Sequence, residues 1–222
     1  MLATAIVCIF ASTAIGAAEF WESKPFLEWS DKEVEKLLTD SPWAVLMSIP
    51  LPNRGPVASA DTGGGGRGGG GGGGGGGESF GPGPMRVRVT ISWRSALPLK
   101  QAVARQQIGK GGAITPAGQA ALDHEEDLYV IGVQGLPPQY TRPGPNSTIQ
   151  AFLRREGKPA IPAKQGGSQP TRGGVILLVG FPKTDPITLA DDDVEFDVKI
   201  GELGFKKKFK LKDLVFNGKL AL

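Results

Sequence analysis

The chain has 222 residues, with 25 Lys and Arg against 22 Asp and Glu and a formal net charge of +3 at pH 7. A charge so nearly balanced argues against a nucleic-acid partner, which calls for a strongly basic surface. The chain contains one cysteine, Cys8, and one histidine, His124. Disulfides within the chain, thiolate metal sites and sites with several histidine ligands are therefore excluded.

Residues 1–18 have the features of a secretory signal peptide. They carry no charged side chain, are mostly apolar and end in three small residues, the last of which is Ala18. This pattern predicts cleavage before Glu19, the loss of Cys8, and export to the periplasm or the exterior. The alternative is a retained N-terminal anchor, but the apolar run is short and interrupted for a membrane-spanning helix. We expect no transmembrane span in the mature chain.

Residues 19–49 are predicted to form a helical, aromatic N-terminal segment that docks on the rest of the protein. Ser30 and Glu33 have the spacing of a capping box, and Trp29 and Val34 that of a hydrophobic staple, so a helix should begin after Ser30. A helix of about ten residues is marginal by itself and must pack on something. Aromatic residues could provide the docking groups, and three of them could instead contact a partner: Trp21, Trp29 and Trp43.

Residues 50–84 are predicted to be a flexible linker. Prolines stand at both of its ends, and residues 63–77 are glycine apart from Arg67. Ordering such a tract would cost conformational entropy that glycine, which has no side chain to bury, cannot offset. The tract should therefore behave as a flexible coil. It lacks the Lys-Ser/Thr pair of a phosphate-binding loop, so we interpret the tract as a linker and not as a ligand site.

Residues 85–222 should form a β-rich globular domain. Alternating or continuous apolar residues predict strands, and capping patterns predict helices. The expected strands cover 87–93, 128–133, 148–155 and 175–179, the last buried on both faces, and the expected helices cover 96–108 and 115–124. Asn217-Gly218 is a signal for a tight turn, so 214–216 should pair with 219–221.

A β-hairpin with a defined register is expected over residues 193–212. Apolar and acidic residues alternate in 193–200, and apolar residues alternate with lysines in 205–212. With residues 201–204 as the loop, one register sets acids opposite lysines on one face and apolar side chains opposite each other on the other face. The predicted charged pairs are Asp197 with Lys208, Glu195 with Lys210, and Asp193 with Lys212.

The lysines of this hairpin also permit a functional interpretation. Lys206, Lys208, Lys210 and Lys212 would project from one face about 7 Å apart, twice the rise of a strand. Such a row could bind a polyanion or a membrane surface. The favoured interpretation is that neighbouring carboxylates neutralise it, because the predicted register brings an acid to most of these lysines.

No residue pattern identifies a catalytic, cofactor-binding or metal-binding site. His124 lies among acids in a stretch typical of a solvated helix end, and no G-x-S-x-G motif accompanies it. Asp185 with Asp191–193 could suggest calcium, but the spacing of a calcium loop is absent. A pair of carboxylates that hydrolyses glycans would leave no local signature, because its members lie far apart in sequence. We expect no cofactor.

Several stretches resemble a pattern that recurs in a family of uncharacterised exported bacterial proteins. They are FWESKPFLEWSDKE at 20–33, LLTDSPW at 37–43, WRSALP at 93–98, FPKTDPIT at 181–188 and KFKLKD at 208–213. The resemblance touches most of the chain outside the expected linker. It implies export from a bacterial cell and brings no catalytic residue with it.

The sequence thus predicts an α+β fold, mainly antiparallel β-sheet and sandwich-like, with a few peripheral helices. The expected function is that of an exported, non-enzymatic binding or structural module of the bacterial envelope. Its partner would be an unknown protein or envelope component. The alternatives are a carboxylate-dependent hydrolase of glycans, and polyanion binding through the four lysines.

Overall fold

The computed structural model describes residues 19–52, 85–142 and 149–222. The predicted signal peptide, residues 53–84 of the predicted linker and residues 143–148 lie outside the described residues. In the part that is described, no helix has the length and apolar character needed to cross a bilayer.

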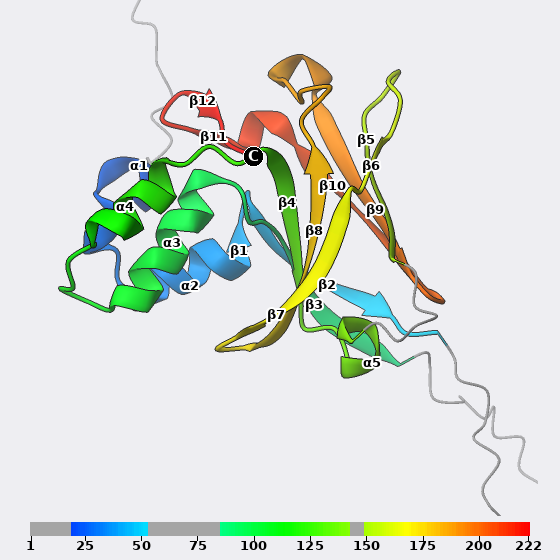
Figure 1. The fold of residues 1–222 in the computed structure, drawn as a ribbon, viewed down its shortest axis with the longest axis horizontal. Helices are drawn as coiled ribbons and strands as arrows, with labels where there is room; N and C mark the ends of the chain where they lie inside the picture. Colours follow the sequence, from blue (N-terminus) through cyan, green and yellow to red (C-terminus); the bar gives the residue numbers. More distant parts are fainter. Residues whose placement is uncertain (1–18, 53–84, 143–148) are drawn as a thin grey trace, which may run out of the picture.

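Three layers make up the described protein, with helices, a large sheet and a small sheet stacked in that order (Figure 1). The helices are α1 Phe20–Ser23, α2 Asp31–Thr39, α3 Leu97–Ile108, α4 Pro116–Asp123 and α5 Pro138–Thr141, with short 3-10 turns η1 Phe26–Glu28, η2 Leu189–Asp191 and η3 Leu211–Asp213. Helices α1 to α4 lie together on one side of the large sheet, and the small sheet lies on the other side (Figure 1).

All strand pairs in the described ranges are antiparallel. The large sheet has the order β1 Asp40–Ser41, β2 Ala44–Pro50, β3 Arg86–Trp93, β4 Leu128–Gln134, β8 Gly174–Pro182 and β7 Gln165–Thr171. The small sheet has the order β10 Leu203–Lys210, β9 Asp193–Ile200, β5 Ile149–Arg154 and β6 Ile161–Pro162, and a hairpin joins β11 Val215–Phe216 to β12 Lys219–Leu220. The predicted α+β fold with mainly antiparallel sheet is confirmed.

The core lies where the two sheets face each other. Phe181 of β8 meets Phe196 of β9 with ring centroids 6.1 Å apart, and Trp93 of β3 meets Phe209 of β10 at 5.7 Å. Both pairs are edge-to-face, the arrangement that aromatic quadrupoles favour. These contacts join the sheets into a sandwich.

The predicted start of helix α2 is confirmed in detail. The Ser30 hydroxyl accepts from the Glu33 backbone N–H at 3.3 Å, and the Glu33 carboxylate accepts from the Ser30 backbone N–H at 2.7 Å. Trp29 and Val34 are both buried, as a hydrophobic staple requires. The helix packs on α3, where the buried Arg105 donates from Nε to the Leu27 carbonyl oxygen at 3.2 Å.

The N-terminal segment does not end as a helical unit. Residues 44–50 form strand β2, which pairs along its whole length with β3. The end of the predicted docking segment is therefore a strand of the large sheet. Alternating Val45, Met47 and Ile49 would have indicated this strand, since their side chains share one face of the sheet.

Within the body, the expected strands and helices appear with small changes of boundary. The turn at Asn217 and Gly218, whose φ angles are 50° and 74°, joins β11 to β12 as predicted. Strand β8 extends beyond the predicted 175–179, and Leu178 on it remains partly exposed. Strand β7 was not expected, because its seven residues are polar, glycine or proline. In the structure all seven are exposed. Backbone pairing with β8 holds it in place.

The hairpin of β9 and β10 forms, but its predicted register is wrong by two residues. Ile200 pairs with Leu203 across a two-residue turn, so Lys206, Lys208 and Lys210 stand opposite Asp197, Glu195 and Asp193. The shorter turn buries Leu203, which is only 1% exposed. Because side chains alternate with a period of two, this shift leaves acids facing lysines and apolar residues facing the core.

The capping box leads to a first prediction. The hydrogen bond from Lys24 and the Ser30 backbone N–H lower the pKa of Glu33 from 4.5 to about 2. A carboxyl whose pKa falls on folding stabilises the folded state above its unfolded pKa, and that contribution declines as the pH falls from 4.5 toward 2. Glu33→Gln should lower the free energy of unfolding by about 1 kcal/mol at neutral pH.

Urea denaturation of both proteins between neutral pH and pH 3.5 measures this difference. The difference in unfolding free energy between wild type and Glu33→Gln should become smaller as the pH falls below about 4.5. A gap that is constant or widens in acid would contradict the role of the ionised carboxylate. Glu35→Gln on the exposed side of the same helix is the control and should change stability little.

Candidate ligand cleft

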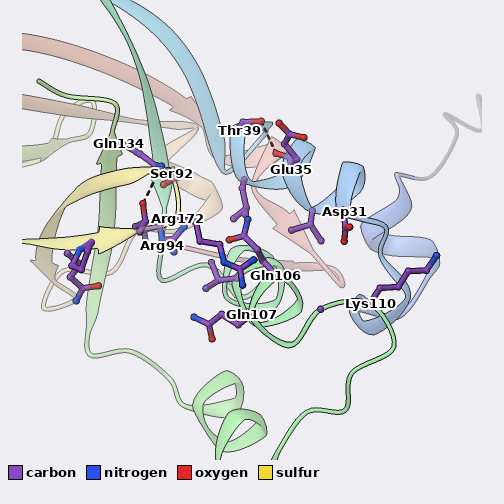
Figure 2. A pocket seen from close by; sticks show the side chains of 18 residues that line it. Asp31, Glu35, Thr39, Ser92, Arg94, Gln106, Gln107, Lys110, Gln134 and Arg172 are labelled. Carbon is purple, nitrogen blue, oxygen red and sulfur yellow. Dashed lines mark hydrogen bonds between the residues drawn. The ribbon is translucent and has the colours of Figure 1, made fainter.

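A cleft of about 1110 Å³ lies between the helices and the open face of the large sheet. We call it the α2/α3 cleft. Its walls come from α2, from α3 and the residues after it, from β3 and β4, and from the hairpin of β7 and β8. Its lining consists of Asp31, Val34, Glu35, Leu38, Thr39, Ser92, Arg94, Val103, Gln106, Gln107, Gly109, Lys110, Gln134, Gln169, Pro170, Thr171, Arg172 and Gly173. Ten of these side chains are labelled in Figure 2.

Arg94 is the most distinctive group on the sheet side of the cleft. It follows β3 directly, and its backbone N–H donates to the Val130 carbonyl oxygen at 2.7 Å. The stem of its side chain lies against Gly132 of β4. Within the described ranges, no carboxylate lies within 4 Å of its guanidinium. Burial lowers the pKa of Arg94 from its ordinary value, but an arginine stays charged at neutral pH.

The tip of the β7–β8 hairpin forms a second wall and carries Arg172. The Gln134 side chain donates to the Thr171 hydroxyl at 3.4 Å, and that hydroxyl donates to the Gly174 carbonyl oxygen at 3.1 Å. These bonds connect the hairpin tip to β4. Arg172 therefore reaches the same cleft as Arg94 from a different element (Figure 2).

The helical wall supplies groups of both charges and neutral amides. Gln106 and Gln107 project from the last turn of α3, and Lys110 follows it. Asp31 and Glu35 lie one turn apart on α2. The lining thus holds three cationic and two acidic side chains, together with carboxamides that donate and accept hydrogen bonds. Such a site suits a polar ligand with a negative group at one end.

Gly132 is predicted to be necessary for the position of Arg94. A Cβ atom at residue 132 would stand 2.8 Å from Arg94 Cγ and 2.6 Å from Ile176 Cδ1, closer than side chains pack. Gly132→Ala should therefore displace the Arg94 stem and lower the free energy of unfolding by about 1–3 kcal/mol. Chemical denaturation measures the loss, and NMR of the Arg94 side chain reports the displacement.

Gly167→Ala on β7 is the matched control, since a Cβ there meets no atom within 4 Å. Its effect should stay within about 0.5 kcal/mol. Equal effects of the two alanines would show that crowding at Gly132 does not constrain Arg94.

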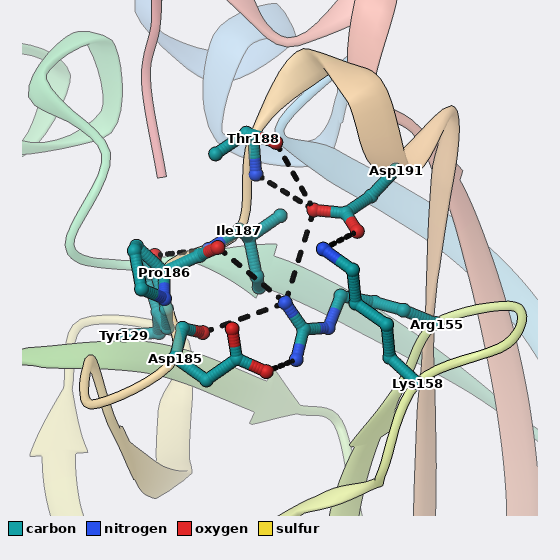
Figure 3. Close-up of polar contacts among 8 residues, drawn as sticks. All are labelled: Tyr129, Arg155, Lys158, Asp185, Pro186, Ile187, Thr188 and Asp191. Carbon is teal, nitrogen blue, oxygen red and sulfur yellow. Dashed lines mark hydrogen bonds and ion pairs between the residues drawn. The ribbon is translucent and has the colours of Figure 1, made fainter.

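A second group of charges lies at the turn after β5 and the loop before β9 (Figure 3). Arg155, whose side chain is fully buried, pairs with Asp185 and donates to the Pro186 carbonyl oxygen at 3.4 Å. Its Nη1 lies 3.8 Å from Asp191 Oδ2, and Lys158 Nζ lies 2.6 Å from Asp191 Oδ1. This network ties two connections of the sandwich together, and its acids are already paired with cations.

The pKa values of these acids are lowered. The Arg155 hydrogen bond lowers the pKa of Asp185 below its usual value. Burial by itself would raise the pKa of Asp191, but the hydrogen bonds from Lys158 and the Thr188 backbone N–H outweigh it and the pKa is lowered. The calcium interpretation of Asp185 and Asp191 is therefore not favoured, because ligand oxygens would first have to leave Arg155 and Lys158.

The three tryptophans considered as partner contacts lie in the core. Trp21, Trp29 and Trp43 are 7%, 1% and 0% exposed. Trp43 packs edge-to-face on Trp21 and on Phe216, and its Nε1 donates to the Ala221 carbonyl oxygen at 2.9 Å. Their side chains join the N-terminal segment to the body and expose little surface, which favours the docking role over partner contact.

The four lysines of the row are exposed, but ion pairs engage two of them. Lys206 Nζ lies 3.1 Å from Glu195 and 3.3 Å from Asp197, and Lys208 Nζ lies 3.1 Å from Asp193. The hydrogen bond to Glu195 raises the pKa of Lys206, and the one to Asp193 raises the pKa of Lys208. These contacts favour the interpretation of a neutralised sheet face.

Lys210 and Lys212 are exposed, Lys210 at the end of β10 and Lys212 in η3.

His124 is exposed just after α4, where its backbone carbonyl oxygen accepts from Lys100 Nζ at 2.8 Å. In the described ranges, no three His, Cys, Asp or Glu side chains gather in a way that could hold a metal ion.

No sequence pattern predicted the cleft. Arg94, Gln134, Gln106 and Arg172 come from separate segments with no shared motif, and each is of a type common on any surface. The one indirect signal is Gly132, a glycine inside a predicted strand, which often marks a close approach of another group.

Comparisons with protein-family models, with curated proteins and with solved structures found no match. The resemblance to exported bacterial proteins therefore stays a prediction.

Proposed function

We propose that this protein is an exported, non-enzymatic binding module of a bacterial envelope, and that its ligand occupies the α2/α3 cleft. The observation that carries the proposal is the guanidinium of Arg94, which lies in a large concave space and pairs with no carboxylate of the described residues, together with the carboxamides of Gln106 and Gln134. Ligand sites typically combine a concave space with a few directed polar groups. Export is supported by the composition of residues 1–18 and by the resemblance to exported proteins.

Four acids outside the cleft are unsuited to act as a general acid. A general acid that works at neutral pH needs a raised pKa, whereas Glu33, Asp185, Asp191 and Asp197 all have lowered ones. The alternative of a glycan hydrolase would have to use the two acids of the cleft, Asp31 and Glu35.

Capture from the cell envelope of the source bacterium tests the binding proposal. The exported protein and a Gln106→Trp variant, in which an indole fills part of the cleft, would be immobilised and compared. Gln150→Trp on the exposed outer face of β5 is the matched control. We expect wild type and Gln150→Trp to retain the same envelope component and Gln106→Trp to lose it.

Retention of the same material by all three proteins would overturn the cleft as the binding site. Release of reducing sugar from envelope glycans that is lost in Asp31→Asn or Glu35→Gln would instead establish the hydrolase. N-terminal sequencing of the exported protein tests export separately, with Glu19 expected as the first residue and Met1 contradicting it.

A further inference from the structure

Resting on the proposed function, we propose that the α2/α3 cleft recognises the free C-terminal carboxylate of a peptide, and that Arg94 is the group that receives it. Arg94 presents a charged guanidinium in a partly buried position, and the described residues provide no carboxylate partner for it. A charge that loses hydration without gaining a partner is unfavourable, so an incoming anion gains affinity there.

The chemistry of the guanidinium favours a carboxylate. Its planar fork of N–H groups matches the two oxygens of a carboxylate in a bidentate contact, and such charge-assisted bonds are stronger than neutral ones. Gly132 lets the Arg94 stem lie flat on β4, which limits the freedom of the head group before a ligand arrives. Arg172 stands at the same cleft and adds positive potential.

The wall of the cleft that α2 forms disfavours an anion with more than one negative charge. Glu35 lines the cleft from α2, as does Asp31, whose Oδ1 lies 3.7 Å from Arg105 Nη2. A doubly charged phosphate near α2 would therefore meet the Glu35 carboxylate and a partly compensated Asp31. A ligand with one carboxylate at Arg94 and a neutral chain that extends toward α2 places no second negative group beside these acids.

The remaining lining is suited to peptide groups. Carboxamides such as those of Gln106 and Gln134 both donate and accept, which is what a peptide N–H and C=O require. Leu38 and Val103, which are both partly exposed, offer an apolar surface for a side chain. The described lining contains no aromatic ring on which a sugar could stack. These features favour a peptide over an acidic sugar.

NMR titration of the full chain tests the inference with a stated probe. The probe is a mixture of N-acetylated tetrapeptides of randomised sequence with a free C-terminal carboxylate, compared with the same mixture amidated at that end. Backbone amides of Ser92, Gln134 and Thr171 report binding in the cleft. We expect the free acids to bind about ten-fold or more tightly than the amides, because a charge-assisted hydrogen bond is lost on amidation.

Arg94→Gln should remove this preference, and Arg88→Gln, which takes the same charge from the exposed start of β3, should keep it. If Arg94→Gln fails to fold, Arg172→Gln on the exposed hairpin tip replaces it and should weaken the free acids more than the amides. Tighter binding of glucuronate or inorganic phosphate than of the free-acid peptides would overturn the peptide assignment.

Equal affinity for both peptide mixtures would overturn the carboxylate inference while the proposed binding function stands. Absence of any shift at the cleft amides would also overturn it, and the capture experiment then decides the proposed function independently.

Discussion

Arg155→Met is expected to lower the free energy of unfolding by about 2–4 kcal/mol, because several buried acceptors lose their donor. Asp191 would lose a charged neighbour while its side chain remains only 2% exposed. Lys158 would still pair with Asp191, but from a position that is 41% exposed. The carbonyl oxygens of Asp185 and Pro186 would also lose their donor.

The neighbouring Arg154 provides a matched control for this prediction. Its side chain is 46% exposed and its Nε donates to Asp197 at 2.8 Å. Arg154→Met should change stability by less than about 1 kcal/mol, since exposed pairs contribute little. Urea denaturation measures both variants. Similar losses for Arg154→Met and Arg155→Met would show that burial does not set the strength of the Arg155 network.

A double variant separates the loss of the pair from the loss of the arginine alone. Arg155→Met combined with Asp191→Asn removes the buried charge that the single substitution leaves behind. The double variant should therefore lose less stability than the sum of the two single variants. Strict additivity would contradict a direct coupling between Arg155 and Asp191.

Trp43→Ala is the second substitution with a large expected effect, a loss of about 3–5 kcal/mol of unfolding free energy. The indole is fully buried and contacts Trp21 of α1 and Phe216 of β11. An alanine would leave a cavity where the N-terminal segment, the large sheet and the C-terminal hairpin meet. Hydrogen exchange should accelerate in β11 and β12 as well as near residue 43.

Trp43→Phe separates the volume of the ring from its hydrogen bond. It keeps most of the ring but removes the donor to the Ala221 carbonyl oxygen, so the loss should be about 1–2 kcal/mol. Met85→Ala, at a side chain that is 73% exposed, should change stability by less than about 0.5 kcal/mol. A loss for Trp43→Ala no larger than that of Trp43→Phe would contradict the packing role of the indole.

The difference between the predicted and observed hairpin registers has a simple physical origin. The alternation of apolar and charged residues decides which side chains face inward, and a shift by two preserves that choice. The turn decides the shift, and here a two-residue turn with Gly201 at φ 60° allows Leu203 to pair with Ile200. Two registers that differ by two residues have the same alternation of apolar and charged side chains. The alternation therefore cannot show which of the two registers buries more apolar area.

The candidate site was beyond prediction for a different reason. The α2/α3 cleft exists because α2, α3, strands β3 and β4 and the tip of the β7–β8 hairpin meet around one space. Strand β7 has no apolar pattern, so neither its position nor that of Arg172 could be predicted. An arginine such as Arg94 becomes distinctive only when the structure shows that no acid of the described residues pairs with it.

Local interactions were within reach of the sequence because they depend on residues close together in the chain. The capping box at Ser30, the tight turn at Asn217 and the inward face of β9 all follow from spacing over a few positions. Tertiary structure alone decided the strand order, the burial of the tryptophans, the pairing of Arg155 with Asp185 and Asp191, and the cleft. Those features depend on which distant segments of the chain come into contact. The contacts are selected by the apolar surface that the whole fold buries and by the charges that it pairs, and a short stretch of sequence contains neither.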